Sequence, residues 1–199
     1  SGGEFREAVI GVPRTMNPVL AVTELDRDIV ALTTRGLFHA DGQGAVVPDL
    51  VQSYNVSEDH KTYTFTLKAN LKWSDGQPLT ARDAVFTLQR IQEPKLASPW
   101  AEGLHDASIA EVGANELTVT LKGPYAPLFE ALTVGLLPEH VWGNVPVENW
   151  RSSPLNLQSV GAGPYRYLDL VRDRSGRLAA LQLEPNPYTH TAAPWFSRF

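Results

Sequence analysis

The sequence predicts a mixed α/β fold that is rich in strands and turns. The chain has 15 Pro and 15 Gly among its 199 residues, a composition that favours frequent turns. Residues 62–68 and 117–122 alternate apolar and polar side chains with a period of two, as strands with one buried face do. Residues 80–91 combine a helix start signal with an apolar stripe. Both kinds of element are therefore expected.

Four further elements are predicted before the central helix. Residues 5–12 are predicted to form a strand, and the Pro-rich residues 13–18 an irregular loop. Apolar residues at helical spacing predict a helix over 26–37, with Gly36 at its end. An Asp-Gly turn signal between short apolar stretches predicts a hairpin over 38–47.

The second half of the chain is predicted to contain short helices and one hairpin. Residues 127–133 suit a short helix that begins with Pro, and residues 137–142 begin another. Residues 145–159 are rich in Pro, Ser and Asn and are interpreted as a connection between two lobes. Residues 165–172 and 177–184 are expected to pair as strands across a turn.

The composition excludes several classes of function. The chain has no cysteine, which excludes a thiol nucleophile, disulfides and Cys-ligated metal sites. A net charge of −5 leaves no positive excess to neutralise phosphates, so no nucleic-acid partner is expected. No apolar run reaches the roughly 18 residues of a membrane helix. Residues 1–4 lack the features of a signal peptide, so we expect a mature or trimmed soluble chain.

Asp75 and Asp83 are candidates for a pair of catalytic carboxylates because they lie only eight positions apart. Thr80 followed by Asp83 is the capping-box spacing, in which two side chains satisfy backbone donors at a helix start. Asp75 precedes Gly76 in an ordinary turn pair. Structural roles account for both aspartates, and we favour these roles over a catalytic pair.

Other catalytic templates are not matched. The histidines are dispersed and lack metal-ligand spacing, so surface or packing roles are favoured over a metal site. They lie at positions 39, 60, 105, 140 and 190. Gly161 and Gly163 are followed by Pro164 and no helix, unlike a phosphate loop, and no serine lies in a Gly-x-Ser-x-Gly elbow. We therefore expect no catalytic residue, no metal and no cofactor.

Six motifs follow one another along the chain: "MNP", "GLF", "VVPDLVQSY", "YTFTLKANLKWSDGQPLTARDAVFTLQR", "VGAGPYRY" and "LEPNPY". Their order resembles the extracellular solute-binding proteins of family 5, the oligopeptide, dipeptide and nickel receptors of ABC importers. The resemblance covers nearly the whole chain, and the long central motif is its most specific part.

The resemblance implies a periplasmic-binding-protein fold of type II, cluster C, in which two α/β lobes lie on a hinge and a subdomain is inserted in the first lobe. On this basis residues 1–37 and 156–199 belong to an incomplete first lobe, and residues 38–155 form the inserted subdomain. Proteins that resemble this chain are more than twice as long. We therefore expect an N-terminal portion without the second lobe.

The resemblance also implies a function that needs no chemistry. The chain would belong to the substrate-binding component of an ABC importer, which captures peptides or similar small solutes outside the cytoplasmic membrane and delivers them to the permease. A periplasmic or extracellular location follows, and the sequence leaves open whether the protein is free or lipid-anchored. We expect these residues alone to bind peptides in the millimolar range or not at all, because in the family the acidic residue that binds the peptide amino group lies in the missing lobe.

Two segments are implied to contact the solute. Alignment through "MNP" and "GLF" places ligand contacts on Val22, Thr23 and Glu24. Alignment through "WSDG" and "SPWA" places an aromatic residue of the ligand cavity on Trp100. The residues themselves leave alternatives open, because a loop aromatic can cover the core and Glu24 can flank the helix that follows.

Two alternative functions remain open, and self-association of the chain is a further expectation. A sensor domain of a transcription regulator would need a DNA-binding helix-turn-helix, and nothing basic precedes Phe5. A carboxylate-dependent hydrolase would need two acids facing each other across a cleft. Loss of the second lobe would expose apolar surface, so self-association is a further expectation.

Overall fold

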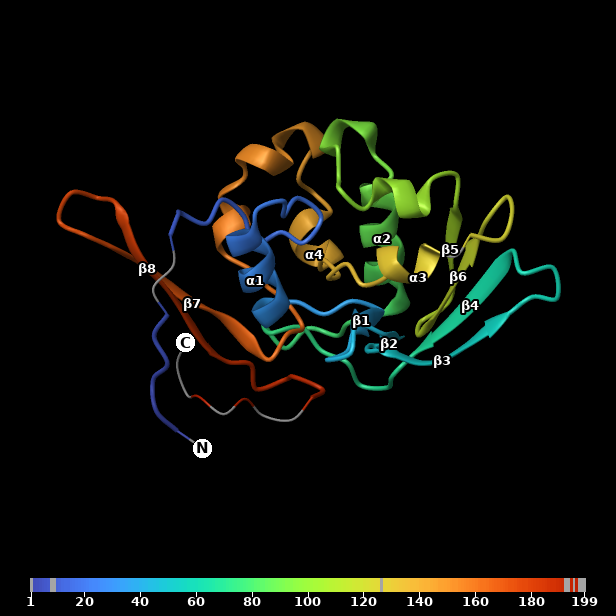
Figure 1. Ribbon diagram of the computed structural model, residues 1–199, viewed down its shortest axis with the longest axis horizontal. Coiled ribbons are helices and arrows are strands. Elements are labelled where there is room, and N and C mark those ends of the chain that lie inside the picture. The colour runs from blue at the N-terminus through green and yellow to red at the C-terminus, as the bar shows by residue number, and fades with distance from the viewer. Residues whose placement is uncertain (1, 8–9, 126, 192–193, 195, 197–199) are drawn as a thin grey trace.

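A computed structural model describes residues 2–7, 10–125, 127–191, 194 and 196. An antiparallel sheet of four strands in the order β3-β4-β6-β5 lies at one end of the molecule, and the long β7–β8 hairpin projects at the other (Figure 1). The strands of the sheet are β3 (Val51–Val56), β4 (Thr62–Leu67), β5 (Ser108–Gly113) and β6 (Glu116–Thr120). Two antiparallel hairpins complete the strands: β1 (Phe38–Ala40) with β2 (Val46–Pro48), and β7 (Tyr165–Arg172) with β8 (Leu178–Pro185).

Helices lie between the sheet and the β7–β8 hairpin (Figure 1). The α-helices are α1 (Glu24–Thr33), α2 (Ala81–Ile91), α3 (Leu128–Ala131) and α4 (Glu139–Trp142). Four short 3-10 helices are η1 (Pro94–Leu96), η2 (Ala101–Leu104), η3 (Val147–Ser152) and η4 (Pro154–Leu157). The predicted hairpins at 38–47 and 165–184, and both short helices after residue 127, are confirmed within one or two residues at their ends.

The central strand β4 forms because its side chains alternate. Tyr63, Phe65 and Leu67 are buried, while the threonines between them are partly exposed. Phe65 lies opposite Leu117 of β6 and Tyr54 of β3, so its ring packs in the middle of the sheet. The alternation predicted for β4 and β6 is confirmed.

Helix α2 packs its apolar stripe on the β5–β6 side of the sheet. Ala84, Leu88 and Ile91 are fully buried. The predicted capping box is present: the backbone N–H of Thr80 donates to Asp83 Oδ2 at 2.9 Å. Asp83 Oδ1 also accepts from the backbone N–H of Glu139 at 2.9 Å, so the same carboxylate fixes the start of α4.

Most of the buried side chains form one large cluster, and a small second cluster lies elsewhere. The large cluster joins the four-stranded sheet, α2, α3 and α4, and includes the fully buried Trp73 and Trp150. Trp150 belongs to the predicted connection 145–159, and its ring lies 4.9 Å from that of Trp142. The small cluster consists of Met16, Ile29, Tyr165 and Leu183, and joins α1 to the β7–β8 hairpin.

Two predicted elements are wrong in whole or in part. The predicted helix 26–37 begins at Glu24 and ends at Thr33. It ends early because the chain beyond it packs closely against residues 133–134, where a Cβ on Gly36 would lie 2.6 Å from the carbonyl oxygen of Thr133. The predicted strand 5–12 is not formed by residues 5–7 or 10–12, where Gly11 has a φ of +125°, and residues 8–9 lie outside the described part.

Candidate functional site

A cavity of about 500 Å³ lies beside the second half of α1. Its apolar wall includes Val30, Phe38 and Trp100, and its polar wall includes Arg35 and Asp49. The residues come from α1, the β1 hairpin and three loops that are distant in sequence. The cavity therefore forms only when the fold is complete.

Trp100 reaches this cavity because two distant loops are bonded to each other. Its indole Nε1 donates to the carbonyl oxygen of Pro18 at 3.2 Å. Ser98 Oγ donates to the carbonyl oxygen of Val19 at 2.8 Å, and the backbone N–H of Trp100 donates back to Ser98 Oγ at 3.4 Å. These bonds join the loop of the "MNP" motif to the loop that carries Trp100.

The other three expected site residues lie beside the cavity and not in its lining. Val22 is 53% exposed, and its carbonyl oxygen accepts from Arg27 Nη1 at 3.1 Å. Thr23 is the N-cap of α1, where its Oγ1 accepts from the backbone N–H of Asp26 at 3.1 Å. Glu24 is exposed in the first turn of α1. Their role as ligand contacts stays a prediction.

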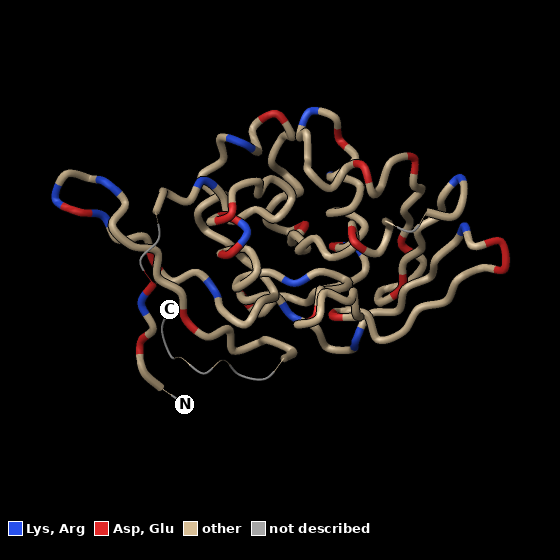
Figure 2. Tube along the Cα trace, in the orientation of Figure 1, with Lys and Arg blue, Asp and Glu red and all other residues tan. Residues whose placement is uncertain are grey.

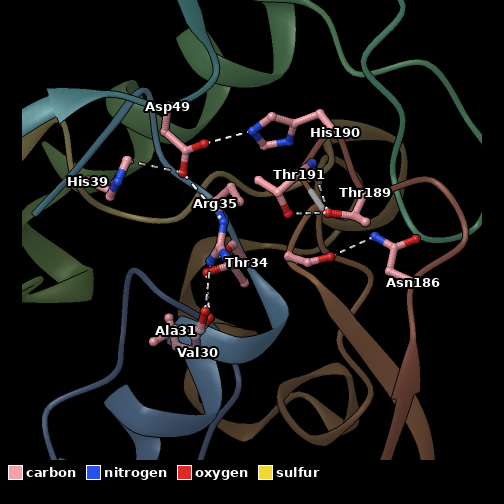
Figure 3. Close-up of polar contacts among 11 residues, drawn as sticks. Val30, Ala31, Thr34, Arg35, His39, Asp49, Asn186, Thr189, His190 and Thr191 are labelled. Carbon is pink, nitrogen blue, oxygen red and sulfur yellow. Dashed lines mark hydrogen bonds and ion pairs between the residues drawn. The ribbon is translucent and has the colours of Figure 1, made fainter. Parts of the chain in front are cut away.

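A polar cluster around Asp49 was not anticipated from the sequence. Figure 3 shows the carboxylate of Asp49 between His39, Arg35 and His190. Its Oδ1 lies 2.7 Å from His190 Nε2. Its Oδ2 lies 3.4 Å from Arg35 Nε and 3.8 Å from His39 Nδ1. Asp49 is only 5% exposed, so its buried carboxylate needs these polar neighbours to offset the cost of leaving water.

Arg35 connects this cluster to the end of α1. Its Nη1 donates to the carbonyl oxygens of Ala31 at 2.8 Å and Thr34 at 3.0 Å, which have no partner in the helix itself (Figure 3). Burial lowers the pKa of Arg35, and the nearby Asp49 opposes that shift. The guanidinium keeps its charge because arginine has a pKa far above neutrality.

His190 lies on the segment that follows β8 and contacts Asp49, the residue directly after β2. Asn186 Nδ2 anchors the start of this segment by donating to the carbonyl oxygen of Gly163 at 2.9 Å. His190 anchors its end on Asp49, 141 residues earlier in the chain. The sequence alone favours a surface or packing role for this histidine, because no local pattern indicates a contact between residues so far apart.

Asp75 and Asp83 each make contacts that hold the fold together. Asp75 Oδ1 accepts from the backbone N–H of Gln77 at 3.0 Å, and its Oδ2 lies 2.7 Å from His140 Nε2. Neither aspartate lines the cavity beside α1. Within the described residues no three His, Asp or Glu side chains gather as a metal site, and no helix is long and apolar enough to cross a membrane.

Several bacterial proteins with similar sequences are named as binding proteins. Residues 45–198 match the family of bacterial extracellular solute-binding proteins, family 5 middle. A Brucella ovis protein named as an ABC transporter peptide-binding protein is 37% identical over 145 residues, which are 68% of this chain and 26% of that protein. Escherichia coli YgiS, named as a deoxycholate-binding periplasmic protein, is 37% identical over 133 residues, 65% of this chain and 25% of YgiS. The chain thus spans about a quarter of the length of these relatives.

A solved structure shows the same fold. The oligopeptide-binding protein AppA of Bacillus subtilis, in complex with a nonapeptide, superposes with a TM-score of 0.89 at 23% identity. The superposition covers 99% of this chain and 39% of AppA. The mixed α/β fold of the periplasmic-binding-protein type, expected from the resemblance, is therefore confirmed. With more than half of its residues matched by the family model, the chain belongs to the bacterial extracellular solute-binding proteins of family 5.

Proposed function

We propose that this chain is part of the substrate-binding component of an ABC importer. The protein captures peptides or similar small solutes outside the cytoplasmic membrane and delivers them to the membrane permease. The single observation that carries this proposal is the bond between Trp100 Nε1 and the Pro18 carbonyl oxygen, which holds an aromatic side chain at the cavity wall. The names of the relatives, which include peptide and deoxycholate binding, agree with it.

In this proposal no bond of the solute is made or broken. The solute lies between two lobes, its polar groups pair with the protein, and its side chains enter partly hydrated pockets. Because the solute favours the closed arrangement, lobe closure is the signal that the permease reads.

We also propose the lobe boundaries that the resemblance implies, residues 1–37 with 156–199 and an insertion at 38–155. The small cluster supports this division, since Met16 and Ile29 pack against Tyr165 and Leu183, all within the first lobe.

The test uses the natural protein that carries this sequence, at its full length. Mass spectrometry first identifies small molecules that the purified protein retains, and calorimetry then measures affinity for them and for small peptides. Trp100→Ala is expected to weaken binding at least about tenfold, because a truncated aromatic at a binding surface costs about 2 kcal/mol. Tyr125→Ala, an exposed aromatic outside the cavity lining, is the control. Equal effects of the two variants, or no retained or bound solute, would overturn the proposal.

The two rival functions find less support. A hydrolase of the carboxylate type needs two opposed acids, whereas Asp49 is the single acid among the described lining residues of the cavity. A sensor domain of a transcription regulator would act through an attached DNA-binding helix-turn-helix, and a nucleic-acid contact by this chain itself would need a basic face. Figure 2 shows Lys and Arg interspersed with Asp and Glu along the described trace.

Location and self-association are separate proposals. We propose a periplasmic or extracellular location, which agrees with the periplasmic relative named above.

For this chain on its own we propose self-association through apolar surface near the N-terminus, where Ile10 is fully exposed and Val12 is 65% exposed. Sedimentation velocity should show a concentration-dependent dimer that Ile10→Ser weakens, and a monomer at every concentration would contradict this.

A further inference from the structure

The cavity beside α1 has an excess of basic side chains, although the whole chain carries a net charge of −5. Arg27, Arg35 and His39 line it, and Asp49 is the one acid among its described lining residues. Asp49 is already engaged by Arg35 and by His190, which lies 2.7 Å away. The two arginines in the lining therefore outnumber its one carboxylate.

Arg35 has hydrogen-bond donors left over for a ligand. A guanidinium carries five N–H donors. Nη1 uses its two on the carbonyl oxygens of Ala31 and Thr34, and Nε faces Asp49. Among the described residues, Nη2 forms no hydrogen bond, and the side chain is 23% exposed in the cavity wall. Burial lowers the pKa of Arg35, which means that its charge is incompletely solvated and gains from an anionic partner.

The rest of the cavity suits an apolar group. Trp100, Phe38 and Val30 lie in its lining. The C-terminus of α1 also borders it, and a helix C-terminus disfavours an anion. Arg35 reduces this opposition because it donates to the last carbonyl oxygens of the helix.

We propose that this cavity binds solutes that carry a carboxylate, which accepts hydrogen bonds from Arg35 Nη2 while the apolar part of the solute packs against Trp100. The inference rests on the proposed function, because it names the chemical class of the solute that the receptor captures. A hydrogen bond between a guanidinium and a carboxylate is charge-assisted, and such bonds are stronger than bonds between neutral groups. A solute in which the carboxylate is replaced by an amide loses this pairing.

The experiment compares two probes that differ only in this group. The full-length natural protein is titrated by calorimetry with the tripeptide Ala-Ala-Phe and with its C-terminal amide. The acid is expected to bind at least about tenfold more tightly than the amide, the range of a hydrogen bond to a charged group. Arg35→Gln should remove most of this difference. Arg90→Gln, which changes an arginine paired with Glu93 outside the cavity, should leave it unchanged.

A second variant acts in the opposite direction. Asp49→Asn keeps the size and one acceptor oxygen but removes the carboxylate that competes for Arg35, so the preference for the acid should widen several-fold. If circular dichroism shows that Arg35→Gln does not fold, Asp49→Asn provides the test instead. An unchanged preference of this variant for the acid over the amide would then overturn the proposal.

The outcomes separate this inference from the proposed function. If acid and amide bind equally and Trp100→Ala weakens both, the receptor function stands and the carboxylate site does not. If the preference for the acid persists in a folded Arg35→Gln variant, the carboxylate is held elsewhere and the inference fails. If neither probe binds, both the inference and peptide capture fail.

Discussion

Trp100 Nε1 donates a hydrogen bond to the carbonyl oxygen of Pro18 at 3.2 Å, although 82 residues separate the two in sequence. This bond joins the loop before α1 to the loop after α2. It also constrains the indole, because the ring edge that carries Nε1 must point at the Pro18 carbonyl oxygen. The wall of the candidate site therefore depends on Trp100, and the packing of the two loops depends on this bond together with the bond from Ser98 Oγ to the Val19 carbonyl oxygen.

Trp100→Phe is expected to lower the free energy of unfolding by about 1 kcal/mol, the usual net value of one hydrogen bond, while most of the aromatic packing is kept. Urea denaturation followed by circular dichroism measures this change. Tyr125→Phe is the control, because it removes a polar atom from an exposed aromatic outside the cavity lining. A loss no larger than that of the control would show that the bond to Pro18 contributes nothing.

Asp83→Ala should destabilise the fold more than Asp75→Ala. The buried Asp83 accepts from the backbone N–H groups of Thr80 and Glu139, so its removal leaves donors at the starts of two helices unsatisfied, at about 1–3 kcal/mol. Asp75 makes a partly exposed contact with His140 and a turn bond, for which about 1 kcal/mol or less is expected. Thermal or urea unfolding of both variants decides the order, and a reversed order would refute the capping role.

The parts of the fold that local signals report were predictable. The alternation in β4 and the Thr80–Asp83 spacing of α2 need only neighbouring residues, and both are confirmed. The strands β3 and β5 were not predicted, because each is an edge strand with one solvent-exposed side and little alternation of buried residues. Their strand conformation is imposed by pairing with β4 and β6, which no local pattern expresses.

The candidate site was predictable only where a motif marked it. Trp100 was identified through the family resemblance, and its loop position agrees with a role at a cavity wall. Asp49 lies inside one of the quoted motifs, yet its role depends on His190, which is 141 residues away. Arg35 lies just beyond the end of α1 at Thr33, whereas the predicted helix extends to residue 37. These residues become a cluster only through tertiary contacts.

Gly161→Ala should be strongly destabilising because the backbone passes very close to the end of α1. A Cβ at this position would lie 1.9 Å from the carbonyl oxygen of Thr33, so one of the two segments must move. Overpacking of this kind costs about 1–3 kcal/mol. At Gly123 a Cβ would meet nothing within 4 Å, and Gly123→Ala should stay within about 0.5 kcal/mol of the parent. Similar melting temperatures for the two variants would contradict the close approach.

His190→Ala and His140→Ala compare two contacts of the same length in different surroundings. Each histidine Nε2 lies 2.7 Å from an aspartate oxygen, but the side chains of His190 and Asp49 are 13% and 6% exposed, against 38% and 33% for His140 and Asp75. Removing a partner from a buried carboxylate costs more than removing one at the surface, so we expect about 1–3 kcal/mol for His190→Ala and about 1 kcal/mol or less for His140→Ala. Hydrogen exchange should also become faster in residues 186–191 of the His190 variant and stay unchanged in β4. Equal losses of stability, together with unchanged exchange in residues 186–191, would show that Asp49 does not hold this segment in place.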